Sequence, residues 1–438
     1  MHLYGSMKIN QNGHLEIGGC DSLKLAEKYG TPLIVYDVSL IRNRARSFLN
    51  AFKQLNINGH VAYASKAFSS VAIFQLINEE GLSLDVVSGG ELYTAIKAHI
   101  PPKKIHFHGN NKSDEEMEMA LDYGIGYFVV DNFHELNRLQ SFCQKRGIRQ
   151  EVLLRMTPGV EAHTHDYILT GQEDSKFGFD LQNGQAEKAL ELALTQPNLE
   201  VKGIHCHIGS QIFETDGFIM AIQKIFTYIE RWKEHFSFIP EIVNVGGGFG
   251  IRYTDEDQPL EPYKYIEAIG KEIIRQANRI QVPIPEIWIE PGRSLVGDAG
   301  TTFYKIGSRK EIHGVRTYIS VDGGMSDNIR PALYDAKYEA VVANKMLELP
   351  KETVSIAGKA CESGDMLIWD ISLPQTKAGD LLAVFCTGAY GYSMASNYNR
   401  LPRPAVVFVE DGKSQLAIKR ESYEDLMKLD VPLYETVK

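Results

Sequence analysis

The chain has 438 residues, of which 44% are hydrophobic and 23% are charged, a composition typical of globular proteins. Its formal net charge of −10 disfavours nucleic acid or an anionic membrane surface as a partner. No apolar run approaches the roughly 20 residues that span a bilayer, and the first residues lack the pattern of a signal peptide. The cysteines are widely spaced and form no C-x-x-C pair, which predicts a cytoplasmic location and neither a disulfide framework nor a zinc knuckle.

Residues 1–37 contain short β-like pieces around turn signals, and a different rhythm begins near residue 38. From there, short apolar runs alternate with stretches whose apolar residues recur at the i, i+3, i+4 spacing of a helix. The runs cover residues 61–65, 82–87, 105–108, 126–130, 151–156, 201–207, 242–245 and 286–290. Eight β–α units within about 250 residues predict a (β/α)8 TIM-like barrel over residues 38–290, with an open doubly wound sheet as the alternative.

A second set of short β-like runs follows the barrel region. These runs cover residues 302–306, 316–321, 338–342, 354–356, 382–386, 405–409 and 416–419. They predict a C-terminal all-β domain over residues 291–438, which we expect the N-terminal strands of residues 1–37 to join. In a barrel, the chemistry gathers at the carboxyl ends of the strands, so a functional site is expected there.

The first barrel strand ends on a single lysine, Lys66, and a helical pattern follows it. A lysine at the end of a buried strand is expected to be partly desolvated, and desolvation favours the neutral, nucleophilic amine. Lys66 is therefore a candidate for forming a Schiff base with a carbonyl compound. The alternative is an ordinary strand-end lysine that reaches solvent.

The second strand carries Asp85 and runs into the sequence Ser-Gly-Gly-Glu at residues 88–91. Two glycines between a strand and a helix let backbone N–H groups approach a ligand closely. Asp85 itself is interpreted either as a tightly buried acid of the site or as a partner for Lys66.

Three His-x-His pairs occur in the barrel region: His106/His108, His163/His165 and His205/His207. On a strand, residues i and i+2 point to the same side, so each pair offers two metal ligands. A metal site needs a third ligand, and no Glu-x-x-His motif or cysteine cluster accompanies any pair. We therefore predict no metal site.

The ends of the sixth and seventh strands combine features of a site for a flat, phosphorylated ligand. The His207 ring is expected to stack on a heteroaromatic ring, and Ser210 to donate to a phosphate. The seventh strand runs into Gly246, Gly247 and Gly248, and bare backbone N–H groups before a helix suit a phosphate. The spacing matches neither the dinucleotide fingerprint nor the nucleotide P-loop. Tight packing alone is the alternative explanation for the glycines.

The eighth strand ends on Glu290, and a Pro-Gly turn containing Gly292 leads to Arg293. Arg293 suits a phosphate or a carboxylate. Glu290, at the end of an apolar strand, suits a cationic ring nitrogen. The alternative is a structural Glu–Arg pair.

One ligand, pyridoxal 5′-phosphate, accounts for all of these features. Lys66 would form the imine with its aldehyde, and His207 would stack on its ring. The glycine-rich stretch at 246–250 and Arg293 would hold the phosphate. Glu290 would keep the ring nitrogen protonated, so that the ring can withdraw electrons from the substrate.

The order of these motifs along the chain resembles the fold-III pyridoxal-phosphate-dependent decarboxylases and, more narrowly, the diaminopimelate decarboxylases. The similarity runs nearly end to end, without a departure at any motif position. It is carried by residues 63–66, 88–91, 205–211, 246–250, 290–293, 321–334, 361–365 and 388–392.

The resemblance implies a barrel with a C-terminal β domain and a head-to-tail homodimer whose active sites are shared between subunits. It implies that Lys66 carries the cofactor, that Glu290 contacts the ring nitrogen, and that Gly248, Arg293 and Tyr390 contact phosphate or substrate. The full set expected to bind the cofactor is Lys66, Asp85, His207, Ser210, Gly246, Gly247, Gly248, Glu290, Gly292, Arg293 and Tyr390.

In the C-terminal domain, the resemblance implies that Arg330 and Tyr334 grip the far carboxylate of the substrate, while Glu362 contacts its far ammonium group. Cys361 is implied to be the proton donor and, with Glu362, to reach the cofactor of the partner subunit. The alternative for Cys361 is a small, buried hydrophobic residue.

The activity implied is decarboxylation of meso-2,6-diaminopimelate to L-lysine and CO2, the last step of lysine biosynthesis, with catalysis by Lys66, Cys361, His207 and Glu290. Three alternatives remain open. They are a decarboxylase of another basic amino acid (ornithine or arginine), an amino-acid racemase, and a non-catalytic homologue.

Overall fold

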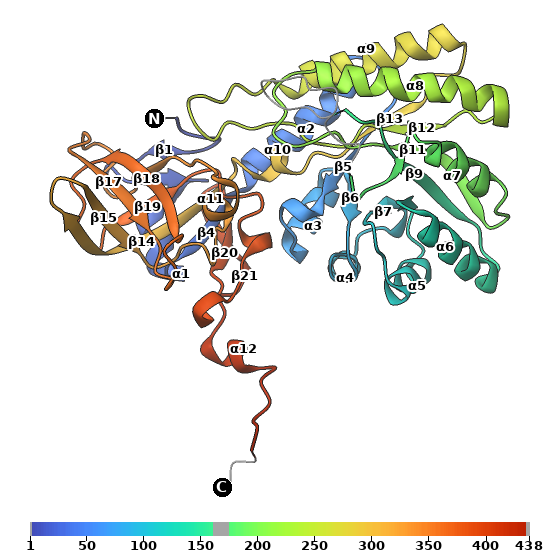
Figure 1. Ribbon diagram of the computed structural model, residues 1–438. Coiled ribbons are helices and arrows are strands. Elements are labelled where there is room, and N and C mark those ends of the chain that lie inside the picture. The colour runs from blue at the N-terminus through green and yellow to red at the C-terminus, as the bar shows by residue number, and fades with distance from the viewer. Residues whose placement is uncertain (1, 161–174, 435–438) are drawn as a thin grey trace. The chain divides into compact units, whose positions relative to one another are not determined.

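The computed structural model describes residues 2–160 and 175–434 (Figure 1). The chain forms two compact units, which we call the barrel unit and the sheet unit. The barrel unit comprises Arg42–Ile251 and Gln258–Leu295, and the sheet unit comprises Met1–Ile41, Arg252–Asp257 and Val296–Lys438. The short segment Arg252–Asp257 thus belongs to the sheet unit, although the chain on both sides of it belongs to the barrel.

Eight parallel strands form a closed barrel, which confirms the fold predicted from the sequence. In order around the barrel, they are β5 (Gly59–Ala64), β6 (Ser83–Val86), β7 (Ile105–Phe107), β8 (Tyr127–Val130), β9 (Gln150–Thr157), β11 (Leu199–His205), β12 (Ile242–Asn244) and β13 (Glu286–Ile289). The last strand pairs with the first, with Ile289 beside Val61, so the open sheet is excluded. A two-residue strand, β10 (Phe179–Asp180), pairs with β9 outside this ring.

Helices follow the strands and cover the outside of the barrel (Figure 1). They are α3 (Val71–Glu79), α4 (Gly89–Lys97), α5 (Asp114–Tyr123), α6 (Phe133–Arg146), α7 (Gln185–Leu194), α8 (Asp216–Phe236) and α9 (Pro262–Ile280), while α2 (Val38–Gln54) begins in the sheet unit and continues into the barrel unit. Helix α8 buries Ile222, Ile225 and Ile229 at the predicted spacing. Side chains of Ser88 and Asn132 cap the first turns of α4 and α6, so each helix starts within a few residues of the preceding strand.

The sheet unit is built on β4 (Leu33–Asp37), which pairs antiparallel with β14 (Gly300–Ile312) and parallel with β20 (Ala405–Glu410). The N-terminal part of the chain therefore contributes to this domain, as predicted. The other strands of its sheet are β15 (Arg316–Val321), β16 (Ala340–Val342), β17 (Glu352–Ala357), β18 (Met366–Leu373), β19 (Leu381–Val384) and β21 (Lys413–Ile418). The first three strands, β1 (Lys8–Ile9), β2 (Leu15–Ile17) and β3 (Cys20–Asp21), form a small sheet of their own.

Strand β18 and helix α1 (Ser22–Tyr29) are among the elements of the sheet unit that the sequence did not predict. Buried and exposed residues do not alternate regularly along β18, because Asp370 adopts a φ of +50° and the β17–β18 register shifts. Helix α1 is short and buries only Ser22 and Leu25, so its apolar periodicity is weak. Short helices α10 (Arg293–Val296), α11 (Arg330–Tyr334) and α12 (Tyr423–Met427) complete the described chain. Within its described residues, no helix is long and apolar enough to cross a membrane.

The barrel interior contains a cluster of Val129, Leu153, Ile242 and Trp288, contributed by four strands. Leu153→Ala removes a fully buried side chain from this cluster, and we expect it to lower the free energy of unfolding by about 2–5 kcal/mol. Urea denaturation followed by circular dichroism measures this change. The matched control is Leu194→Ala on α7, where the side chain is 43% exposed and the expected effect stays within about 0.5 kcal/mol. Equal effects of the two substitutions would contradict the assigned core.

Candidate active site

Lys66 lies in a 3-10 turn, η1 (Ser65–Ala67), immediately after β5. Its side chain is exposed, so the prediction of a partly desolvated amine is wrong. The strand ends two residues before Lys66, which therefore lies in the turn that follows the strand and not on the buried strand itself. Its ammonium still acts on the site, because its charge lowers the pKa of His207.

His207 follows β11 and is half-buried. Burial lowers the pKa of its imidazole well below the usual range, and the nearby Lys66 ammonium lowers it further. The ring is therefore neutral at pH 7. Gly246 lies directly against it, since a Cβ at that position would be 3.0 Å from His207 Nδ1. A neutral imidazole beside the glycine loop is suited to stacking against a flat ring.

The glycine loop, residues 246–250, packs alongside the segment that follows β11. Ile212 N–H donates to Gly248 O at 2.9 Å, and Gly250 N–H donates to Ile212 O at 3.0 Å. Gly246 and Gly248 have φ values of +74° and +105°, and a Cβ on Gly248 would lie 2.4 Å from the Gly209 carbonyl oxygen. Tight packing, the alternative considered from the sequence, is therefore a real requirement of this loop.

Close packing of the glycine loop leaves some of its backbone N–H groups without a hydrogen bond among the described residues. The N–H groups of Gly247 and Gly248 make no hydrogen bond to any residue that the structure describes. These donors remain available to an anion.

Arg293 and Ser210 meet at the ends of two different strands. Arg293 is 9% exposed, and its Nη2 donates to Ser210 Oγ at 3.0 Å. Gly292 packs against the end of β5, where a Cβ would lie 3.0 Å from Ala64 Cβ. Ser294, which the sequence interpretation missed, has a buried hydroxyl that makes no hydrogen bond within the described chain. In the sequence, only its position directly after Arg293 could have indicated that Ser294 belongs to the site.

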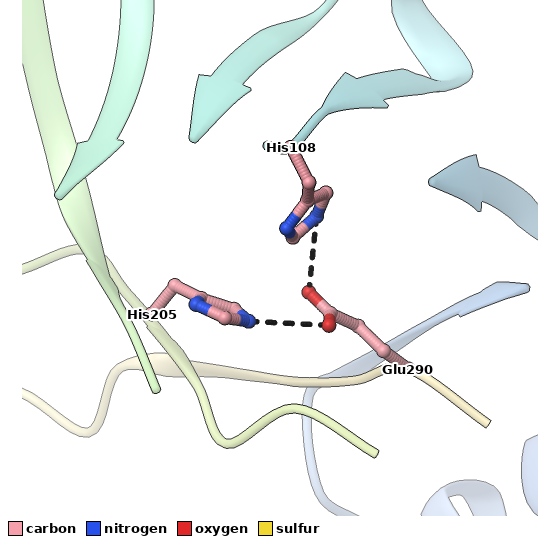
Figure 2. A group of neighbouring side chains, drawn as sticks. All are labelled: His108, His205 and Glu290. Carbon is pink, nitrogen blue, oxygen red and sulfur yellow. Dashed lines mark hydrogen bonds and ion pairs between the residues drawn. The ribbon is translucent and has the colours of Figure 1, made fainter. Parts of the chain in front are cut away.

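Glu290 lies just past β13, and Figure 2 shows its carboxylate beside the imidazoles of His108 and His205. Its Oε2 lies 3.1 Å from His205 Nε2, and its Oε1 lies 3.3 Å from His108 Nε2. Asn244 Nδ2 donates to the same Oε1 at 2.6 Å. The structure therefore surrounds Glu290 with imidazole and amide groups, while Arg293 contacts Ser210.

The Glu290 carboxyl is ionised. Burial alone raises the pKa of a carboxyl, but here the imidazoles of His205 and His108 outweigh that effect and hold the pKa well below its usual range. Burial in turn lowers the pKa of His205, while the nearby Glu290 carboxylate opposes that effect. His205 Nδ1 has no hydrogen-bond partner among the described residues, and Nε2 is the ring atom that faces Glu290 and donates to it.

Asp85 is a buried acid, the first of the two interpretations proposed for it. Its Oδ1 lies 3.0 Å from His106 Nδ1 and 3.6 Å from His108 Nε2. The described part of the chain contains no ion pair between Asp85 and Lys66. His108 thus lies between two carboxylates, Asp85 and Glu290.

His108, His205 and Glu290 also offer three ligand atoms that all lie within 4.8 Å of one another. The His-x-His spacing did not predict this group, because its members come from three different strands. The absence of a metal site therefore stays a prediction. The pair His163/His165 lies outside the described residues.

In the sheet unit, Arg330 is surrounded by tyrosines. Its Nε donates to Tyr338 Oη at 2.9 Å. Its guanidinium carbon lies 5.6 Å from the centre of the Tyr334 ring, 5.7 Å from that of Tyr253 and 5.8 Å from that of Tyr390. Three of the predicted residues thus come together, and two tyrosines that no sequence spacing indicated join them.

Cys361 and Glu362 lie on an exposed loop of the sheet unit. Cys361 is exposed while the other cysteines are buried, so the alternative of a buried hydrophobic residue is wrong for it. Its N–H donates to Asn399 Oδ1 at 2.6 Å. Asp365 accepts a hydrogen bond from Met325 N–H at 2.6 Å, which ties this loop to the segment preceding Arg330.

The depressed pKa of Glu290 predicts how stability depends on pH. Because the folded pKa lies below the unfolded value of about 4.3, ionisation of Glu290 stabilises the fold above that pH, and this stabilisation is lost as the pH falls. The difference in unfolding free energy between the native chain and Glu290→Gln should be constant from pH 7 to 5 and shrink below pH 4.5. Urea denaturation across this range measures it, and a pH-independent difference would contradict the assignment.

Comparison with known proteins agrees with these features. A family model described as pyridoxal-dependent decarboxylase, pyridoxal binding domain, matches residues 38–297. The chain is 64% identical over 438 residues to diaminopimelate decarboxylase of Bacillus subtilis (strain 168), covering 100% of both chains. It is 66% identical over 421 residues to that of Bacillus methanolicus, covering 96% of this chain and 98% of the relative.

Solved structures extend the similarity to the whole fold. Diaminopimelate decarboxylase from M. jannaschii in complex with L-lysine matches with a TM-score of 0.91 and 37% sequence identity, covering 98% of each chain. The chain therefore belongs to the pyridoxal-dependent decarboxylases and, among them, to the family of diaminopimelate decarboxylases.

Proposed function

We propose that this chain decarboxylates meso-2,6-diaminopimelate to L-lysine and CO2, with pyridoxal 5′-phosphate as its cofactor. The observation that carries the proposal is the gathering of a lysine, a neutral histidine, an ionised buried glutamate and a glycine loop at one end of a closed barrel. The family to which the chain belongs performs this reaction.

The residues present fit this cofactor. The N–H donors of the glycine loop, with Arg293 and Ser210, would hold its phosphate. Glu290, the ionised carboxylate, would face the ring nitrogen, and His207 would contact the ring face. Lys66 would attach the aldehyde covalently. When bound, the cofactor supplies an electron sink for the electron pair released as the substrate carboxylate leaves as CO2.

Each residue then has a stated task. Glu290 keeps a proton on the ring nitrogen, because an ionised carboxylate in a buried site favours a cation beside it. The Cys361 thiol donates the proton that replaces CO2 on the α-carbon. Its position on an exposed loop supports the proposal that it acts in a site shared with a second subunit.

Arg330 accounts for the choice of substrate. A guanidinium reads a carboxylate through two parallel hydrogen bonds, and the far end of diaminopimelate carries a carboxylate. Tyr338 holds the guanidinium from its Nε side. Glu362 would contact the ammonium group beside that carboxylate. Lysine and ornithine lack the far carboxylate, so they would leave Arg330 without its partner.

We further propose that the chain works as a head-to-tail homodimer in the cytoplasm. A shared site explains why a proton donor and a substrate-binding acid lie on an exposed loop. Free cysteines fit a reducing compartment.

Borohydride reduction tests the function as a whole. We expect the Lys66 peptide of the purified enzyme to gain the mass of a reduced pyridoxyl group, and the untreated enzyme to release one CO2 per L-lysine formed from meso-diaminopimelate. Lys66→Arg keeps the charge but cannot form the imine, so it should show neither result. An adduct on another lysine, or no CO2 release, would contradict the proposal.

Substitution of Arg330 tests substrate selection. We expect Arg330→Ala to lower kcat/KM for diaminopimelate by roughly a hundredfold, since a buried bidentate pair is lost. Arg330→Lys keeps the positive charge but not the forked guanidinium, so its kcat/KM for diaminopimelate should lie between those of the native enzyme and Arg330→Ala. Assays of CO2 release from diaminopimelate and from lysine give the preference, and an unchanged preference in Arg330→Ala would refute this role.

A further inference from the structure

Two buried residues hold the carboxylate of Glu290, and neither belongs to the set expected from the sequence. Asn244 is the last residue of β12 and His205 the last residue of β11, and each is 1% exposed. Asn244 Nδ2 donates to Glu290 Oε1 at 2.6 Å, and His205 Nε2 donates to Oε2 at 3.1 Å. Each carboxylate oxygen thus has its own buried donor (His205 is visible in Figure 2).

Asn244 also binds the glycine loop. Its Oδ1 accepts a hydrogen bond from Gly246 N–H at 2.9 Å, and the Gly246 carbonyl accepts one from Glu290 N–H at 2.9 Å. Asn244, Gly246 and Glu290 therefore form a closed circuit of three hydrogen bonds. This circuit joins the acid to the loop whose N–H groups are available to an anion.

The circuit has little freedom. Gly246 has a φ of +74°, and a Cβ there would lie 2.5 Å from the Cys206 carbonyl oxygen, so no larger residue fits at this position of the loop without a backbone shift. A carboxylate accepts about four hydrogen bonds, and Oε2 accepts one from His205. Oε2 therefore keeps the capacity to accept a further N–H from a ligand.

We propose that Asn244 and His205 are positioning residues that hold the Glu290 carboxylate in one orientation, and that Asn244 ties it to the glycine loop. The inference rests on the proposed function, in which Glu290 keeps a proton on the ring nitrogen and the loop holds the phosphate. Asn244 then sets the distance between Glu290, which faces the ring nitrogen, and the glycine loop, which holds the phosphate. His205 sets the orientation of the Glu290 carboxylate.

The test uses holoenzyme loaded with pyridoxal 5′-phosphate that carries 15N in its ring. The 15N resonance distinguishes a protonated from a neutral ring nitrogen, and the 31P resonance of the same sample reports the phosphate. His205→Leu removes a donor to Glu290 and should move the 15N resonance toward the neutral form without changing 31P. His205→Gln restores an N–H at similar reach and should restore the native 15N value.

The Asn244 variants separate its two contacts. Asn244→Asp keeps the acceptor for Gly246 N–H but places a second carboxylate against Glu290. The ring 15N resonance should therefore shift, while the phosphate 31P resonance should keep its native position. Asn244→Leu removes both contacts, so both resonances should move. Because a buried hydrogen bond to a charged group is lost, we expect kcat to fall about tenfold to a hundredfold in Asn244→Asp, with a smaller change in KM.

Glu290→Gln separates failure of this inference from failure of the proposed function. If Glu290→Gln keeps the native 15N resonance, the proposed role of Glu290 is wrong. If Glu290→Gln moves the resonance but Asn244→Asp and His205→Leu do not, only the positioning inference is overturned. If the Asn244 variants do not fold, the His205→Leu and His205→Gln pair decides the question, because a purely structural role would leave 15N unchanged in both.

Discussion

One buried negative charge organises the carboxyl end of the barrel. An ionised carboxylate away from water is costly unless donors surround it, and Glu290 finds donors on His205 and Asn244, with the imidazole of His108 close by. These donors come from different strands. The charge is therefore tolerated only when the strands close into a barrel with their ends aligned, and a function that needs this charge depends on the closed fold.

The glycine loop meets two demands at once. Its glycines allow the backbone to pass within contact distance of the segment after β11, where a side chain would collide with carbonyl oxygens. The same lack of side chains leaves backbone N–H groups open to an anion. Packing and ligand binding, which seemed to be competing explanations of the glycines, are two results of one geometry.

The two units carry different parts of the proposed chemistry. Under the proposed function, the barrel unit holds Lys66, His207, Glu290 and the glycine loop, which would bind the cofactor from the ends of the strands. The sheet unit holds Arg330 among its tyrosines and presents Cys361 on an exposed loop that Asn399 and Asp365 fasten.

The sequence by itself determined the barrel, because eight apolar runs alternating with helical periodicity leave few other ways to bury their surfaces. It also indicated Lys66, His207 and Glu290, because each closes a strand that can be recognised locally. Only the tertiary structure decided what surrounds them. The contacts of Glu290 with Asn244 and His205 join residues 46 and 85 positions apart, and no local pattern encodes such a distance. The exposure of Lys66 and the pairing of Asp85 with His106 depend in the same way on where a strand ends and which neighbour the closed barrel brings to it.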